Sequence, residues 1–224
     1  MPINAWWAKD PNERYWLEIT DREHLGGDLH APKSAQSGDE TWSYSLVSCV
    51  HDGDIVFHYW KQAGQEKAIV GYSRATGSLE STTIRWQPHG TYGRANETPT
   101  TRPAWLFPLS NFTNLPTPVT LEMLWALEPR IRKLSEELAE RFEPPHYLPF
   151  VFSDKRPLRT AQGYLTKLPA SFVMAIPGLE EALQVPAPRR AGVTPVPAQR
   201  TPGRAEPDTS RTLCGASRLS LASL

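Results

Sequence analysis

A short apolar run at Ile55–Trp60, with the sequence IVFHYW, constrains the fold more than any other feature of this chain. Nearly all of its residues are aromatic or β-branched, which is typical of a buried strand. Gly53 and Asp54 stand just before the run, and the polar stretch Gly64–Lys67 follows it as a turn. The run AIVGYS at Ala68–Ser73 comes next and predicts an antiparallel partner. The sequence therefore predicts a buried β-hairpin.

Other segments predict a sheet with few helices. Arg14–Thr20, Thr82–Trp86 and Ala104–Leu109 are rich in β-forming residues and predict strands. The stretch Gln87–Pro103 predicts a long polar loop, and loops of this length are usually functional or disordered. A mixed sheet of this kind predicts an α+β fold, in the form of a small twisted β-barrel with flanking helices.

Helical spacing begins after Thr120, a predicted N-cap, and Pro129 should divide the segment into two helices. Short helices are predicted at Pro169–Met174 and Leu179–Leu183. The apolar residues that recur at helical spacing predict a packing face, and they are Leu121, Leu124, Leu127, Ile131, Leu134 and Leu138.

The composition changes at residue 185. Residues 185–224 contain six prolines, six arginines and no aromatic residue. Such a segment buries too little apolar surface to offset its ordering entropy. We therefore expect a domain over residues 1–184 and a disordered Pro/Arg-rich tail over 185–224. The favoured interpretation of the tail is a solvated segment without function, and the alternative is a weak hold on phosphates through its arginines.

The charges balance overall but not locally. Lys+Arg and Asp+Glu both number 24, so the chain as a whole does not attract a polyanion. Between Asp154 and Lys167, however, Lys155, Arg156 and Arg159 occur without an intervening acidic residue. Two cysteines, no secretory signal and no long apolar run predict a cytoplasmic protein without a disulfide framework or membrane contact.

Motifs for catalysis or cofactor binding are absent from the sequence. It contains no HExxH, GxSxG, Walker A or GxGxxG motif, and we expect no cofactor. The group His51, Asp52, Asp54 and His58 resembles a metal set, but Gly53 between the two acids favours a turn. A binding protein is therefore favoured over an enzyme.

The eight tryptophans fall into three groups. Trp16, Trp105 and Trp125 lie in periodic segments and are predicted to be core residues, whereas Trp6 and Trp7 are candidates for the start of the sheet. The remaining three stand where a predicted strand meets a polar loop, and they are Trp42, Trp60 and Trp86. Aromatic rings in such places stack on planar ligands, including bases taken out of a duplex, although each alone is more often a packing residue.

The order WW…RYWLEITDR…LGGDLHAP…GDIVFHY…AIVGYSRATG, closed by RTAQGYLTKLPASF, resembles the EVE domain, a YTH-like member of the PUA superfamily. Among EVE domains it is most similar to those fused to HNH nucleases in bacterial modification-dependent restriction systems. It also resembles a small actinobacterial 5-methylcytosine-binding domain of the same fold. The resemblance extends from about Asn4 to Leu183.

This resemblance implies a twisted β-barrel that flips a modified base, most simply 5-methylcytosine, from double-stranded DNA into an aromatic pocket. LGGDLHAP would be a loop at that pocket, with His30 where a tryptophan is usual, so that Trp42 or Trp86 would replace it. Alternatively, ETWSYS supplies the pocket through Trp42 and Ser43. The implied pocket set is Asp21, His30, Ala31, Pro32, Trp42, Ser43, Tyr44, Trp60 and Trp86. The implied DNA-backbone set is Arg94, Arg102, Lys155, Arg156, Arg159 and Gln162.

The nuclease of the restriction relatives has no counterpart here, because no histidine follows residue 185. The resemblance then implies a reader of modified DNA, with a separately encoded nuclease as a partner. The sequence leaves three alternatives open: a PUA-like enzyme acting on nucleosides or RNA bases through Lys61, Thr76 and Glu80, an RNA-binding module, and a protein–protein adaptor. It does not determine the oligomeric state.

Overall fold

A computed structural model describes residues 2–22, 24–35, 38–61, 66–87 and 98–184 of the chain. The chain divides into a unit of residues 1–189 and a second unit of residues 190–224, and all the described residues belong to the first. The predictions for the tail and for Arg94 therefore lie outside the described residues. No helix among the described residues is long and apolar enough to cross a membrane.

A five-stranded sheet forms the centre of the unit, in the order β10-β1-β3-β4-β7. β1 and β3 are parallel, and every other neighbouring pair in this sheet is antiparallel. Its strands, in chain order, are β1 (Tyr15–Thr20), β3 (Ile55–Trp60), β4 (Ala68–Ala75), β7 (Leu109–Thr120) and β10 (Leu165–Lys167).

Two smaller sheets accompany it. The first has the order β2-β6-β5 and contains β2 (Leu29–Pro32), β5 (Glu80–Trp86) and β6 (Thr100–Phe107). The second is the hairpin of β8 (Phe150–Val151) and β9 (Arg159–Thr160). The strand ladders through the described residues form these three separate sheets and not a closed barrel, so the α+β class is confirmed without barrel closure.

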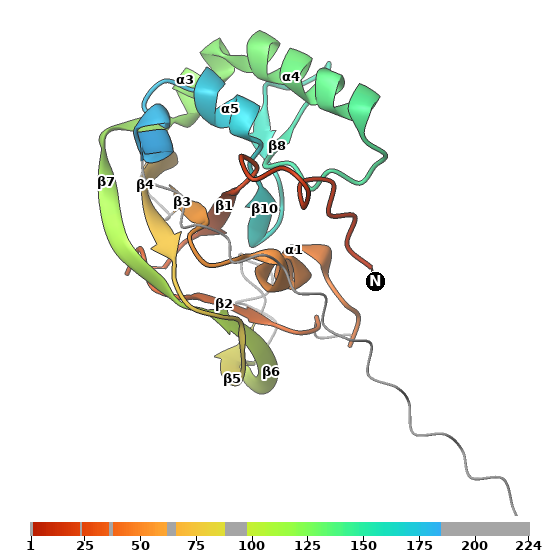
Figure 1. The fold of residues 1–224 in the computed structure, drawn as a ribbon, viewed down its shortest axis with the longest axis vertical. Helices are drawn as coiled ribbons and strands as arrows, with labels where there is room; N and C mark the ends of the chain where they lie inside the picture. Colours follow the sequence, from red (N-terminus) through yellow and green to blue (C-terminus); the bar gives the residue numbers. More distant parts are fainter. Residues whose placement is uncertain (1, 23, 36–37, 62–65, 88–97, 185–224) are drawn as a thin grey trace, which may run out of the picture. The chain divides into compact units, whose positions relative to one another are not determined.

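Helices α3 (Leu121–Ala126), α4 (Glu128–Arg141) and α5 (Ala170–Ala175) cover one face of the five-stranded sheet, above it in Figure 1, while α1 (Trp42–Ser45), β2, β5 and β6 lie below it. Thr120 caps the first of these helices, accepting a hydrogen bond from the Met123 amide, as predicted. Pro129 stands in the first turn of the next, where a proline fits because its missing N–H has no helical partner. The structure also contains the 3-10 turns η1 (Leu46–Cys49) and η2 (Glu180–Gln184).

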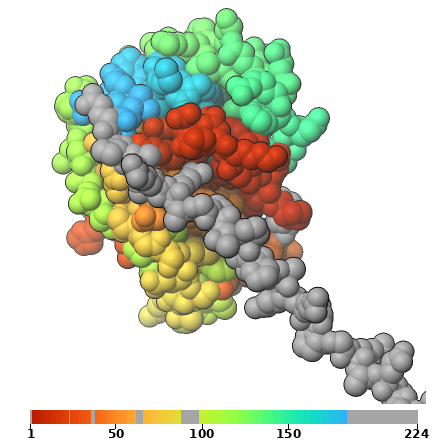
Figure 2. All heavy atoms as spheres, viewed as in Figure 1, coloured from red at the N-terminus to blue at the C-terminus, as the bar shows by residue number. Residues whose placement is uncertain are grey.

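The two faces of the sheet belong to two hydrophobic clusters. Alternation along β1 and β3 sends Leu17 and Phe57 toward the helices, and Trp16 and Val56 toward β2, β6 and η1. In the space-filling view of Figure 2, the red N-terminal segment lies between the helices, in blue and green, and the strands in yellow.

Several sequence predictions are confirmed and others are wrong. The predicted hairpin is β3–β4, and the predicted helical stripe does pack against the core. The twelve residues of β7 were predicted as a strand only at Leu109, since prolines and asparagines interrupt their apolar pattern. Trp125 is 44% exposed and is not a core residue. Trp6 and Trp7 lie in a turn before β1 and not in the sheet.

The turn interpretation of the acidic pair Asp52 and Asp54 agrees with the contacts. Gly53 has φ +83°, a conformation that favours glycine. Asp54 Oδ2 accepts hydrogen bonds from Trp16 Nε1 at 2.8 Å and from the His51 amide at 3.0 Å, and Asp52 accepts one from the Gly77 amide. These carboxylates are therefore occupied in fixing the entry to β3.

Candidate nucleic-acid interface

A row of aromatic side chains comes together from three elements. The Tyr44 ring of α1 lies 5.7 Å from the Trp86 ring, at the end of β5, with the planes nearly perpendicular. Its other neighbour is Tyr164, just before β10, at 6.5 Å between ring centroids. Trp42, at the start of α1, packs against Tyr147 at 5.5 Å. We call the contacting rings Tyr44, Trp86 and Tyr164, together with Trp42 of the same helix α1, the aromatic row.

Gly163 permits the close approach of α1 to the segment before β10. A Cβ atom at this position would lie 3.0 Å from Ser43 Cβ and 3.1 Å from Trp42 Cη2. Both contacts are tighter than ordinary van der Waals separation, so any side chain at Gly163 would displace the helix or the indole. The absence of a side chain at Gly163 therefore sets the position of Trp42.

The rings of the row differ in exposure. Trp42 and Tyr44 are half-buried, so each keeps part of its ring surface open to solvent. Trp86 is 7% exposed and carries the Arg102 guanidinium 5.6 Å above its ring. That guanidinium also donates to the Ala35 carbonyl at 2.8 Å. Trp42 and Tyr44 are thus the partly exposed members, and Trp86 packs edge-on against Tyr44.

A buried ionic network lies beside the row. Glu18 is fully buried and accepts hydrogen bonds from Arg22 and from His58 Nδ1, the latter at 2.7 Å. The second ring nitrogen of His58 pairs with Ser73 Oγ at 2.9 Å. Burial by itself would raise the pKa of Glu18, but the hydrogen bond from His58 and the charge of Arg22 outweigh it and lower the pKa. Glu18 is therefore an ionised carboxylate inside the protein.

Tyr164 connects this network to β2. Its hydroxyl accepts a hydrogen bond from the His30 amide at 2.9 Å and bonds to the Glu18 carboxylate. Burial, and then the negative charge of Glu18, raise the pKa of Tyr164 well above its ordinary value. The phenol therefore stays protonated and can donate to Glu18. Sequence reasoning missed Tyr164, because one tyrosine in a closing strand motif gives no signal of its own.

Two side-chain nitrogen atoms in the residues around Glu18 and Tyr164 have no hydrogen-bond partner among the described residues. They are His30 Nε2 and Arg22 Nε, and both are shielded from solvent. Burial and the nearby charge of Arg22 lower the pKa of His30, which favours the neutral imidazole. A neutral imidazole can donate or accept, whereas Arg22 Nε can only donate. His30 and Arg22 thus have unused hydrogen-bonding capacity, and His30 is the residue whose amide bonds to Tyr164 of the aromatic row.

The other predicted pocket residues take different positions. LGGDLHAP was expected as a loop, but Leu29–Pro32 is strand β2, in which Ala31 and Pro32 are buried against β6. Pro32 is compatible with a strand here because β2 is an edge strand with a single partner. Asp21 follows β1 and is half-buried, and Ser43 is buried under Gly163. Trp60 ends β3, and no ring contact joins it to the row within the described part of the chain.

The basic residues around the β8–β9 hairpin differ in their exposure to solvent. Lys155, Arg156, Arg159 and Gln162 are exposed on and after the β8–β9 hairpin. Lys167, the last basic residue of that stretch, is fully buried; its ammonium group donates to the Tyr15 carbonyl at 2.9 Å and lies 5.2 Å from the Trp16 ring. The exposed cations remain candidates for phosphate contacts, and Lys167 is a structural residue.

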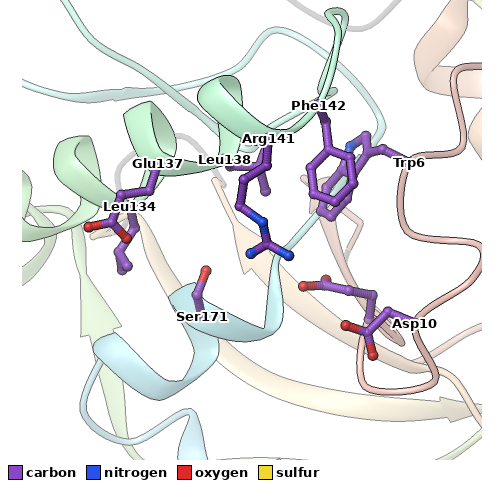
Figure 3. A pocket seen from close by; sticks show the side chains of 9 residues that line it. Trp6, Asp10, Leu134, Glu137, Leu138, Arg141, Phe142 and Ser171 are labelled. Atoms are coloured by element: carbon purple, nitrogen blue, oxygen red, sulfur yellow. The ribbon is translucent and has the colours of Figure 1, made fainter.

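A separate hollow of about 110 Å³ lies between the N-terminal segment, α4 and α5. In Figure 3 the rings of Trp6 and Phe142 face each other on one side of it, and the Arg141 guanidinium extends into it. The remaining lining residues are Asp10, Glu13, Leu134, Glu137, Leu138 and Ser171. None of the predicted pocket residues lines this hollow.

The residues of the enzyme alternative lie apart. Ile55 pairs with Arg74, so Thr76 lies near the start of β3, while Lys61 follows its end. At about 3.3 Å per residue, the six residues of β3 separate the two by roughly 20 Å. Lys61, Thr76 and Glu80 therefore do not converge on one reacting group.

No family model and no curated protein matches the sequence. Human THYN1, solved in complex with DNA containing 5-methylcytosine, is 10% identical and covers 77% of this chain and 99% of its own, at a TM-score of 0.40. Atu2648 from Agrobacterium tumefaciens is 13% identical, covering 78% and 98% at a TM-score of 0.40. Rpa0253 from Rhodopseudomonas palustris is 15% identical, covering 76% and 95% at a TM-score of 0.38. Likeness at this level supports no conclusion about this chain.

Proposed function

We propose that this protein is a binding module for modified DNA that receives a flipped base, most simply 5-methylcytosine, at the aromatic row. The observation that carries the proposal is the contact of the Tyr44 ring with Tyr164, whose hydroxyl accepts the hydrogen bond from the His30 amide. Trp42 adds a second half-buried ring from the same helix. Stacking surface and hydrogen-bonding capacity thus occur side by side, as a site for a planar polar ring requires. The resemblance of the sequence to EVE domains points to the same class of ligand.

The energies of such a site determine how it would select its base. Flipping costs a few kcal/mol, and stacking returns roughly 1–3 kcal/mol for each aromatic partner. A methyl group adds only about 0.8 kcal/mol when it is buried. Two open rings therefore suffice to hold a flipped base, and preference for the methylated form requires a close apolar contact at its C5 position.

His30 and Arg22 are the proposed readers of the base edge. Cytosine presents the acceptors O2 and N3 on its Watson–Crick edge, and Arg22 Nε offers a donor to either of them. His30 Nε2, in the neutral tautomer that carries its proton on Nδ1, supplies the acceptor that the exocyclic amine needs. Exposed Arg156, Arg159 and Gln162 would hold the DNA backbone, and a separately encoded nuclease would act on the marked DNA.

The test is a gel-shift series on one duplex that is unmodified or carries 5-methylcytosine, 5-hydroxymethylcytosine or N6-methyladenine. The parent protein should bind the 5-methylcytosine duplex most tightly. Trp42→Ala and Tyr44→Ala should lose that preference and keep their melting temperatures within a few degrees, because both side chains are half-buried. Trp60→Ala is a matched control outside the row.

Two outcomes would contradict the proposal. The first is an unchanged methyl preference in both row variants. The second is tighter binding of N6-methyladenine than of 5-methylcytosine by the parent. Tighter binding of the same sequence as RNA would favour an RNA-binding module instead.

A further inference from the structure

Trp125 on α3 is an exposed ring held by a hydrogen bond. The side chain is 44% exposed, and its indole N–H donates to the Leu158 carbonyl at 2.8 Å. The bond fixes one edge of the ring while much of its surface stays in solvent. A ring fixed in this way loses little side-chain entropy when a ligand packs on it.

The acceptor residue, Leu158, is held on both sides. Its side chain is fully buried in the helix-covered cluster, and its amide donates to Glu128 Oε2 of α4 at 2.9 Å. The indole of α3 and the carboxylate of α4 therefore hold the same residue of the β8–β9 hairpin. Arg156 and Arg159 flank Leu158, so their backbones have fixed positions relative to the Trp125 ring.

The hairpin beside this ring is basic. Lys155, Arg156 and Arg159 are exposed, and no ion pair occupies them within the described part of the chain. The carboxylate of Asp154, the acidic residue of this segment, lies 3.8 Å from Arg132 of α4. An aromatic platform bordered by free cations is the combination that proteins use to bind single-stranded nucleic acid, with stacking on the bases and ion pairs to the phosphates.

We infer that Trp125 and the β8–β9 hairpin form a second nucleic-acid contact that stacks on an unpaired base. This inference rests on the proposed function in one respect, which is that the ligand of both sites is nucleic acid. The chain continues from Arg159 to Tyr164 in five residues, at most about 17 Å, so this surface adjoins the aromatic row. A strand rising 3.4 Å per nucleotide would cover that distance with about five nucleotides.

The experiment measures the binding of the full chain to an unmodified single-stranded oligothymidylate of twelve nucleotides by fluorescence anisotropy over a range of salt concentrations. Trp125→Ala should weaken binding by about fivefold or more, because one stacked base is lost. Trp125→Phe retains a ring but not the N–H donor, and it should bind within about twofold of the parent. Met123→Ala, an exposed residue of the same helix, is the matched control and should have no effect.

The charges are tested in the same assay. Arg156→Ala and Arg159→Ala should each reduce the slope of log affinity against log salt by about 0.7, the value for one phosphate of a single strand. The contact is disproved if Trp125→Ala binds like the parent, or if Trp125→Phe is as weak as Trp125→Ala, since the ring would then have only a structural role. The methyl preference of the two Trp125 variants on duplex DNA should be unchanged, so that failure here and failure of the aromatic row are distinguishable.

Discussion

The two faces of the five-stranded sheet are buried by different means. On the face under α3, α4 and α5, β1 and β3 contribute aliphatic and aromatic side chains without a formal charge, such as Leu17 and Phe57. On the opposite face, the same two strands contribute Trp16 and Val56 and then Glu18 and His58, a hydrogen-bonded pair that is equally buried. A buried charge costs more free energy than a buried hydrocarbon unless it is paired. The helix-covered face is thus held mainly by apolar packing, whereas the other face also buries a charge that its partners must compensate.

The largest effect should come from the helix-covered face. Phe57→Ala removes a fully buried ring and should lower the free energy of unfolding by about 4 kcal/mol. Urea unfolding measures this loss. At a temperature where the variant is folded, its preference for methylated duplex should equal that of the parent. A changed preference would mean that the two faces are not independent.

The next effect concerns Glu18 on the other face and its ion pair with Arg22. Glu18→Gln removes the charge that compensates Arg22 and should cost about 3 kcal/mol at neutral pH. Because the pKa of Glu18 is lowered in the folded protein, its carboxylate stabilises the fold above the ordinary value of 4.5, and this contribution is lost as the pH falls below that value. Unfolding free energies between pH 3 and 7 should therefore decline toward acid in the parent and less steeply in the variant. Parallel pH profiles would show that Glu18 is not the group responsible.

A smaller effect is expected at Tyr164. Tyr164→Phe removes the hydroxyl that bonds to the His30 amide and to Glu18, at a cost of about 1–2 kcal/mol. Since the pKa of Tyr164 is raised, the folded state keeps a proton that the unfolded state releases above pH 10, and stability should fall as the pH rises beyond that value. Thermal melts at pH 9 and 11 should show a smaller decline for the variant than for the parent. Tyr72→Phe, on the helix-covered side, is the control.

The smallest change in stability, with a larger change in binding, is expected from Gly163→Ala. The added methyl group meets Ser43 and Trp42 at about 3 Å and should cost about 1 kcal/mol as α1 shifts. Binding of 5-methylcytosine duplex should weaken by more than that value implies, because Trp42 moves with the helix. Equal losses of stability and affinity would indicate that the row has no part in binding.

Local signals in the sequence account for much of the fold. The apolar run of β3, the cap at Thr120 and the break at Pro129 predict elements that the structure contains. The sequence predicts β7 only at its first residue, because prolines and asparagines interrupt its apolar pattern, and it predicts β2 as a loop because two glycines precede it. Tertiary pairing stabilises both strands. Local pattern also misplaced Trp125, whose position in an apolar periodic segment predicted burial.

The candidate site is less accessible from the sequence than the fold. Tryptophans at predicted loop mouths led to Trp42 and Trp86, and the resemblance to EVE domains added His30 and Tyr44. Tyr164 joins them only through a contact across more than a hundred residues, and nothing in its local sequence indicates such a contact. Lys167 is a further residue whose position the sequence does not indicate. A lysine is usually exposed, but the Tyr15 carbonyl and the rings around its ammonium group hold this one inside the protein.

The position of β1 between β3 and β10 has a consequence for synthesis of the protein. Trp16 pairs with Val56 on one side and with Lys167 on the other, and contacts of such long sequence separation form slowly. A nascent chain leaving the ribosome exposes the apolar side chains of β1 long before the codons of β10 have been translated. Chaperone binding to the residues around Trp16 is therefore expected during translation, and premature termination before Leu165 should yield a polypeptide that proteases remove.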